Sequence, residues 1–190
     1  MFEKIQAWDE HWVIRINNRK FGRVVNNIFV YFTHIGSMIP WIIVCLVLLL
    51  LNQYELAKTI GAGLIQFGII QSLIKFVIRR KRPYKNEKIK DEIELRDVLL
   101  RNGGHSLPSG HTATITLQSL ILVYHFNNYY IIIFTICGVL FVGYSRLYLG
   151  AHYPTDIIAG VVFGLTLLLL LPATLWLVNQ IEALIFSAIN

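Results

Sequence analysis

Charged residues are scarce in this chain: they make up 15% of its 190 residues, against 55% hydrophobic residues, and the mean hydropathy is +0.58. This composition excludes an ordinary soluble domain of the same length. Cysteine is scarce as well. Cys45 and Cys137 both fall inside long apolar runs, where a free thiol behaves as a small apolar residue. The sequence therefore predicts neither a disulfide framework nor a cysteine metal site.

The N-terminus lacks the uninterrupted apolar core and the small-residue cleavage site of a signal peptide. Residues 1–23 instead interleave charges with apolar residues at helical spacing, among them Ile5, Trp8 and Trp12. This pattern predicts an amphipathic helix that lies in the membrane interface or packs on the rest of the protein. The sequence contains no internal repeat, so we expect residues 1–190 to form a single membrane-embedded domain.

Long apolar runs are what the chain has in abundance. A helix needs about 20 apolar residues to cross the roughly 30 Å hydrocarbon core of a bilayer. Five runs suit this role, at residues 28–51, 56–78, 109–126, 129–145 and 157–178. The first contains Gly36 and Pro40, where a helix can kink or split, so six spans are an alternative. The predicted fold class is all-α: a polytopic transmembrane helix bundle of five or six spans.

The second apolar run ends in a cationic cluster. Lys75 and Arg82 are seven residues apart, which is two helical turns, so both side chains can point to one place and hold an anion. Pro83 should then end the helix. In the alternative interpretation, residues 79–82 are a stop-transfer cluster that contacts lipid headgroups. The charged segment that follows, 79–107, is expected to be a loop or a short surface helix near the site.

The third run opens with the sequence PSGH. Ser109 is suited to cap a helix, which would leave the backbone N–H groups of Gly110 and His111 facing outward at the positive end of the helix dipole. Such a helix start can bind an anion. Gly110 would let a ligand approach the backbone closely, and His111 adds a titratable imidazole. The same residues are also common as a plain helix start.

The last cluster joins the fourth and fifth runs. Arg146 ends the fourth run, and Pro154 suits the first position of the next helix. Asp156 follows His152 by four residues, so its carboxylate can accept a hydrogen bond from one ring nitrogen and leave the other free to attack. We expect His152 to lie at a solvent-facing helix start. A purely structural histidine–aspartate pair is the alternative.

The order of the spans brings the three clusters together. If five spans alternate in direction, the end of the second, the start of the third, the end of the fourth and the start of the fifth lie on one membrane face. Three cations, a helix N-terminus, two histidines and a carboxylate would then meet there. This combination is typical of a phosphate site, in which arginine favours bidentate contacts.

The three clusters also resemble the signature of the type 2 phosphatidic acid phosphatase (PAP2) superfamily. The matching motifs are KxxxxxxRP at 75–83, PSGH at 108–111 and SRxxxxxHxxxD at 145–156. The resemblance implies a metal-independent phosphatase without a cofactor. It implies that His152 is the nucleophile, Asp156 its orienting partner and His111 the general acid. It further implies a set of phosphate-binding residues: Lys75, Arg82, Ser109, Gly110 and Arg146.

The expected substrate is a lipid phosphate, because the site would lie at the membrane boundary. Similar bacterial proteins act on undecaprenyl diphosphate, phosphatidylglycerophosphate, phosphatidic acid or lipid A, and the sequence does not select among them. We expect a multi-pass protein of the cytoplasmic membrane that binds no nucleic acid, and we leave its oligomeric state open. Two alternatives are a membrane protein that only binds anionic lipid and a zinc hydrolase using His105, His111, His152 and Asp156.

The distribution of positive charge bears on orientation. When Lys75, Arg82 and Arg146 are set aside, thirteen of the remaining fourteen lysines and arginines lie on the face of the motifs, and only Lys58 lies opposite. The positive-inside rule therefore places the N-terminus and the site in the cytoplasm. Many bacterial proteins with this signature work instead on the outer face.

Overall fold

The computed structural model describes residues 2–97 and 104–189, so part of the predicted loop, 98–103, lies outside the described residues. Within these ranges the chain is helical and contains no strand, which confirms the all-α class. The helices in chain order are α1 (Phe2–Asn17), α2 (Arg23–Phe32), α3 (Met38–Leu50), α4 (Tyr54–Ile78), α5 (Gly110–Phe126), α6 (Tyr129–Tyr148) and α7 (Pro154–Ile189).

The first predicted span is broken, as Gly36 and Pro40 indicated. A short 3-10 helix, η1 (Thr33–Gly36), separates α2 from α3, and the two segments meet at an angle of 57°. Gly36 is needed at this break because a Cβ there would lie 2.6 Å from the carbonyl oxygen of His111. The break therefore brings the backbone of η1 against the start of α5.

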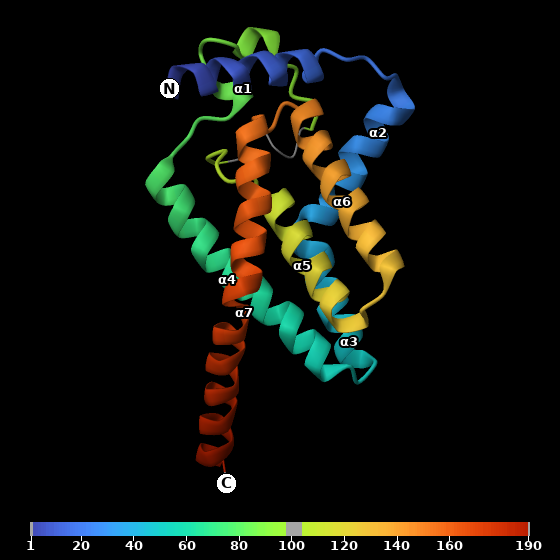
Figure 1. The fold of residues 1–190 in the computed structure, drawn as a ribbon, viewed down its shortest axis with the longest axis vertical. Helices are drawn as coiled ribbons and strands as arrows, with labels where there is room; N and C mark the ends of the chain where they lie inside the picture. The colour runs from blue at the N-terminus through green and yellow to red at the C-terminus, as the bar shows by residue number, and fades with distance from the viewer. Residues whose placement is uncertain (1, 98–103, 190) are drawn as a thin grey trace.

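Three helices, α4, α6 and α7, are long and apolar enough to cross a membrane, and the bent pair α2–α3 would make a fourth span. Their outward faces carry many exposed large apolar side chains, as expected for surfaces that contact lipid. The third expected span, 109–126, coincides with α5, which has 17 residues. α7 is longer than predicted, and its C-terminal part projects beyond the other helices (Figure 1).

α5 is the central helix of the bundle and packs against α4, α6 and α7. Its contact with α7 is close because α7 presents glycines. A Cβ on Gly160 would lie 2.7 Å from the carbonyl oxygen of Ser109, and one on Gly164 would lie 2.8 Å from that of Ala113. The close approach also allows the N–H of Ser109 to donate to the carbonyl oxygen of Asp156 at 3.0 Å. The starts of α5 and α7 are thereby held side by side.

α1 lies across one end of the bundle (Figure 1). Its buried face consists of Asp9, Val13 and Asn17, whereas Ile5 and Trp8 are 43% and 45% exposed. The Asn17 side chain donates to the carbonyl oxygen of Tyr148 at the end of α6, at 2.8 Å. α1 therefore packs on the bundle, which is one of its two expected settings, and presents apolar side chains outward.

The described part of the segment after α4 contains two 3-10 turns, η2 (Pro83–Lys85) and η3 (Lys90–Glu92). α4 ends with the second apolar run and stops short of Pro83, where the helix was expected to end. Its last residue is Ile78, and Arg79 adopts the left-handed conformation with φ of 47°. Residues 79–82 are not helical, so Arg82 does not share a helix with Lys75, although the sequence had indicated that it would.

Candidate active site

One cavity of about 230 Å³ lies at the end of the bundle that α1 covers. Its walls come from the α2–α3 break, α4, α5, the end of α6 and the loop before α7. Six of the eight predicted site residues line it: Lys75, Arg82, Gly110, His111, Arg146 and His152. The other two, Ser109 and Asp156, are fully buried and do not line the cavity. The three sequence clusters thus meet in space.

Three cations reach the cavity from different directions. Lys75 belongs to the last turn of α4, and Arg82 is fixed by donation from its Nε to the carbonyl oxygen of Gly104 at 2.8 Å. Arg146 has no exposed surface, and its Nη1 lies 3.4 Å from Thr33 Oγ1. Among the described residues its Nε has no hydrogen-bond partner. A buried guanidinium N–H without a partner is costly, so the site favours an anion that can accept it.

The start of α5 has the predicted cap. Ser109 is the N-cap residue, and its Oγ accepts a hydrogen bond from the N–H of Thr112 at 3.4 Å. This bond and a 2.9 Å contact with Thr112 Oγ1 occupy the Ser109 hydroxyl behind the cavity wall. Gly110 lies against Gln71, because a Cβ at Gly110 would be 2.3 Å from Gln71 Nε2. The backbone of α5 therefore reaches the cavity where a side chain would not fit.

The two histidines face the cavity from α5 and from the loop before α7. His111 Nε2 is buried and has no hydrogen-bond partner in the described part of the chain. His152 was expected to face solvent, but its side chain is only 1% exposed. The loop before α7 is in contact with the segment that follows α4, because Arg82 Nη1 donates to the carbonyl oxygen of Ala151 at 3.5 Å. An attacking imidazole here would be shielded from bulk water.

Asp156 supports the His152 ring from behind. Its Oδ2 lies 3.5 Å from His152 Nδ1, an electrostatic contact rather than a formed hydrogen bond, because Nδ1 has no hydrogen-bond partner among the residues described. The same oxygen accepts the N–H of Tyr153 at 2.9 Å. Pro154 begins α7, as predicted, which places Asp156 in the first helical turn. The carboxylate is therefore held at a fixed position beside the ring.

The electrostatic setting keeps His152 neutral. Its burial is the largest cause that lowers the pKa of His152 well below the usual value, and the positive charges of Arg82, Arg146 and Lys75 act in the same direction. A backbone hydrogen bond with Ser106 acts in the opposite direction. A neutral imidazole is the form that can act as a nucleophile.

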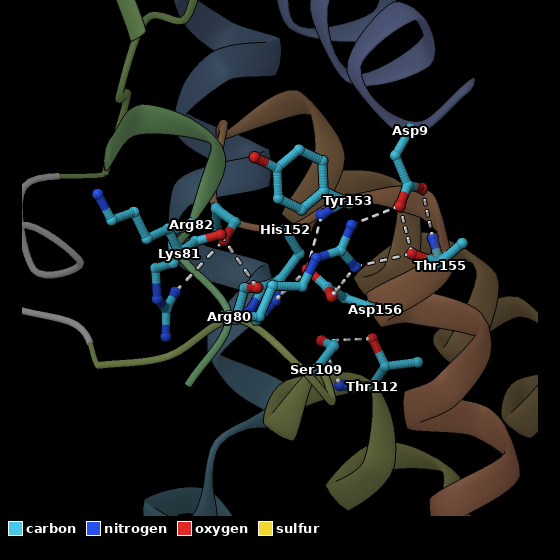
Figure 2. A network of polar contacts seen from close by, with 12 residues as sticks. Asp9, Arg80, Lys81, Arg82, Ser109, Thr112, His152, Tyr153, Thr155 and Asp156 are labelled. Atoms are coloured by element: carbon cyan, nitrogen blue, oxygen red, sulfur yellow. Dashed lines mark hydrogen bonds and ion pairs between the residues drawn. The ribbon is translucent and has the colours of Figure 1, made fainter. Parts of the chain in front are cut away.

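Sequence reasoning missed a network behind the dyad, which Figure 2 shows. Arg80, interpreted as part of a possible stop-transfer cluster, donates to Asp156 Oδ1 at 2.7 Å and to Asp9 Oδ2 at 2.5 Å. Asp9 comes from α1 and is fully buried. One signal was available: Asp9, Val13 and Asn17 follow each other at intervals of four, which puts two polar residues on the same helix face as a core valine.

The arrangement of donors does not resemble a metal site. Within residues 2–97 and 104–189, no group of three or more His, Cys, Asp or Glu side chains is placed to hold a metal ion. The cavity instead combines cations, unpartnered N–H groups and a helix N-terminus. Such a cavity is suited to hold a phosphoryl group.

These features define a membrane helix bundle with a cavity at one end that is lined by three cationic side chains. The model of the PAP2 superfamily matches residues 56–180, more than half of the chain. The chain therefore belongs to the PAP2 superfamily.

Two curated relatives illustrate this membership. An undecaprenyl-diphosphatase of Sulfolobus acidocaldarius is 28% identical over 144 residues, covering 74% of this chain and 66% of the relative. A lipid A 1-phosphatase of Rhizobium etli is 32% identical over 150 residues, covering 65% of this chain and 60% of the relative. The chain thus spans about two thirds or less of the length of these relatives.

Two solved structures share the fold. The crystal structure of LpxE from Aquifex aeolicus superimposes with a TM-score of 0.74 at 20% identity, over 87% of this chain and 95% of that one. A PAP2-type phosphatidylglycerolphosphate phosphatase of Bacillus subtilis gives a TM-score of 0.68 at 23% identity, over 90% of this chain and 85% of that one. The chain therefore has the same fold as these two proteins.

Proposed function

We propose that this protein is an integral membrane lipid phosphatase that hydrolyses a phosphate monoester or diphosphate through a phosphohistidine intermediate. The observation that carries the proposal is the single cavity lined by Lys75, Arg82, Arg146, His111 and His152. Two buried nitrogen atoms of this cavity, Arg146 Nε and His111 Nε2, have no hydrogen-bond partner among the described residues. Because a buried polar atom without a partner is costly, both support a phosphoryl group as the missing partner.

In the proposed first step, the ring nitrogen of His152 that lies away from Asp156 attacks phosphorus. The new N–P bond forms as the bond between phosphorus and the leaving oxygen breaks, and His111 gives that oxygen a proton. Lys75, Arg82, Arg146 and the N–H of Gly110 stabilise the negative charge on the phosphoryl oxygens. Asp156 stabilises the positive charge that develops on the ring.

In the second step, water attacks the phosphohistidine. His111, now without its proton, accepts one from the water, the N–P bond breaks and inorganic phosphate leaves. His152 returns to its neutral form. No metal or cofactor takes part in this proposal. The placement of Asp156 behind the ring, 3.5 Å from Nδ1, supports a role in orientation rather than in proton transfer.

We propose a lipid phosphate as the substrate, of the undecaprenyl diphosphate, phosphatidylglycerophosphate or phosphatidic acid type. Met38 and Phe67 add apolar surface to the cationic cavity, as a phosphate attached to a lipid requires. The names of the relatives, lipid A phosphatase and undecaprenyl-diphosphatase, support this substrate class. The protein would then work in the cytoplasmic membrane, on a substrate that diffuses laterally.

We further propose five spans, with α2 and α3 as one broken span and α5 as the short central one. Seventeen residues of α helix extend about 25 Å. α1 contacts the ends of α6 and α7 next to the site, which supports an N-terminus on the site's face, as five spans require. Together with the positive-inside distribution, this supports a site that faces the cytoplasm.

Cysteine labelling of intact cells tests the orientation. The loop after α4 needs an accessible position for the cysteine. Lys88 is exposed, whereas the nearby Asn86 is half-buried and bonded to Glu10 and Tyr153, so the cysteine is placed at Lys88. On a cysteine-free background, we expect an impermeant reagent to label Ser187→Cys and to spare Lys88→Cys. Labelling of Lys88→Cys with protection of Ser187→Cys would place the site on the outer face.

The function itself is tested by phosphate release from a panel of lipid phosphates. We expect activity that persists in EDTA and is inhibited by vanadate, which mimics the phosphoryl transition state. Activity lost in EDTA and restored by zinc would favour the hydrolase alternative. Binding of anionic lipid without phosphate release from any substrate would favour the binding protein.

A further inference from the structure

The starting point is the way in which Asp156 is held. Its two carboxylate oxygens have different partners: Oδ2 serves His152 and the N–H of Tyr153, and Oδ1 accepts from Arg80 Nη1 at 2.7 Å. Asp156 has no exposed surface. A buried carboxylate with a separate partner on each oxygen cannot rotate without breaking one of these contacts. Arg80 therefore determines which oxygen faces the histidine.

Arg80 is in turn held by three other residues. Its Nη2 donates to Asp9 Oδ2 at 2.5 Å, and its Nη1 also donates to Thr155 Oγ1 at 2.8 Å. Its guanidinium carbon lies 4.2 Å from the centre of the Tyr153 ring. The planar fork of an arginine suits such a bridge between two carboxylates, and a lysine could not reproduce it.

Asp9 connects this bridge to the N-terminal helix. Its Oδ1 accepts the N–H of Thr155 at 2.9 Å, and its Oδ2 accepts the Thr155 hydroxyl. Thr155 lies in the first turn of α7, whose free N–H groups favour a negative partner. The Asp9 side chain has no exposed surface. α1 thus places a buried charge at the helix start that carries Asp156, although the two aspartates are far apart in the sequence (Figure 2).

From this geometry we infer that Arg80 and Asp9 are positioning residues of the catalytic dyad, and that α1 is a working part of the active site. The inference rests on the proposed phosphatase function. Arg80 orients Asp156 and offsets the negative charge of its carboxylate. Asp9 holds Arg80 in place and offsets part of the positive charge of the guanidinium. Neither residue touches the substrate cavity, since neither lines it.

The charge balance makes opposite predictions for the two residues. Charged or titratable groups reach His152 from every surrounding element: Lys75 and Arg82 from α4 and the segment after it, His111 from α5, Arg146 from α6, and Asp156 from α7. Removing the positive charge of Arg80 makes this environment more negative and favours the imidazolium. Removing the negative charge of Asp9 makes it more positive and favours the neutral ring.

The experiment measures kcat, KM and the acidic limb of kcat/KM in four purified forms: wild type, Arg80→Gln, Asp9→Asn and the double variant. We expect each single variant to lose at least about tenfold in kcat while KM changes by less than about threefold. The limb should move up by about half a pH unit in Arg80→Gln and down by a similar amount in Asp9→Asn. The double variant, with both charges removed, should have a limb near that of the wild type.

Three further variants separate these effects from a general loss of structure. Arg80→Lys keeps the positive charge but not the planar guanidinium group that bridges the two carboxylates. The acidic limb of its kcat/KM should therefore stay in place while its kcat falls. Arg79→Gln and Glu3→Gln remove exposed charges of the same two segments and should match the wild type. Thermal unfolding in detergent identifies any variant that does not fold. Because Asn can still accept the N–H of Thr155, Asp9→Asn is expected to keep α1 docked.

The outcomes are distinguishable. A wild type that releases no phosphate from any lipid overturns the proposed function and this inference with it. If the wild type is active, the inference alone is overturned when the folded single variants keep their kcat, or when their limbs move in the same direction.

Discussion

Gly110 offers a prediction that depends on a single contact. A Cβ added there would lie 2.3 Å from Gln71 Nε2, more than an ångström closer than the 3.4 Å of ordinary contact. The amide of Gln71 is the flexible end of its side chain, so Gly110→Ala should displace it rather than break α5. Gln71 lines the same cavity, and its displacement would narrow the space for a phosphoryl group.

The magnitude follows from overpacking. Forcing a methyl group into a filled site costs about 1 to 3 kcal/mol, and the better helix propensity of alanine returns at most about 1 kcal/mol. We therefore expect Gly110→Ala to unfold at a slightly lower temperature. We also expect its KM for a lipid phosphate to rise at least about tenfold, because the displaced amide competes with the substrate.

A second substitution tests the cause. Gln71→Ala removes the atom that the new methyl group meets. The KM of the double variant should therefore be close to that of the Gln71→Ala single variant. Gly138→Ala is the matched control, since a Cβ there meets nothing closer than 3.7 Å. The reasoning would be refuted if the double variant were as impaired as Gly110→Ala alone, or if the control were equally impaired.

The remaining predictions concern the reacting groups. His152→Gln should abolish turnover and leave no acid-labile phosphoenzyme on gels, whereas Asp156→Asn should lose about a thousandfold or more in kcat, by analogy with triads whose carboxylate is neutralised; substantial turnover by His152→Gln would contradict a covalent mechanism. His111→Ala should impair alkyl phosphates far more than p-nitrophenyl phosphate, whose leaving group needs little protonation, and equal losses would remove it from the general-acid role. Because its surroundings lower the pKa of His152, the ring stays neutral to below the usual value of about 6.5, so the acidic limb of wild-type kcat/KM should lie below that pH; a limb near pH 7 would contradict this.

Local features of the chain could be predicted from the sequence because their causes are local. Apolar runs predicted α4 and α6 to within a few residues of their bounds, since burial in lipid is decided by composition over one helix. The cap at Ser109 and the start of α7 at Pro154 follow from the hydrogen bonds and backbone angles of single residues. The expectation that the three clusters meet is confirmed, because residues of all three line one cavity.

Other features were decided only by the tertiary structure. The chain leaves the helix before Pro83, although that proline was expected to end α4, and His152 is buried rather than solvent-facing. The sequence pattern could not indicate either, because each depends on the loops that pack around the site. The bridge from Asp9 through Arg80 to Asp156 joins three segments, and Asp9 and Arg80 are 71 positions apart in the sequence. Charge pairs at such separations leave no periodicity in the sequence, since only the packing of α1 across the bundle brings them within hydrogen-bond distance.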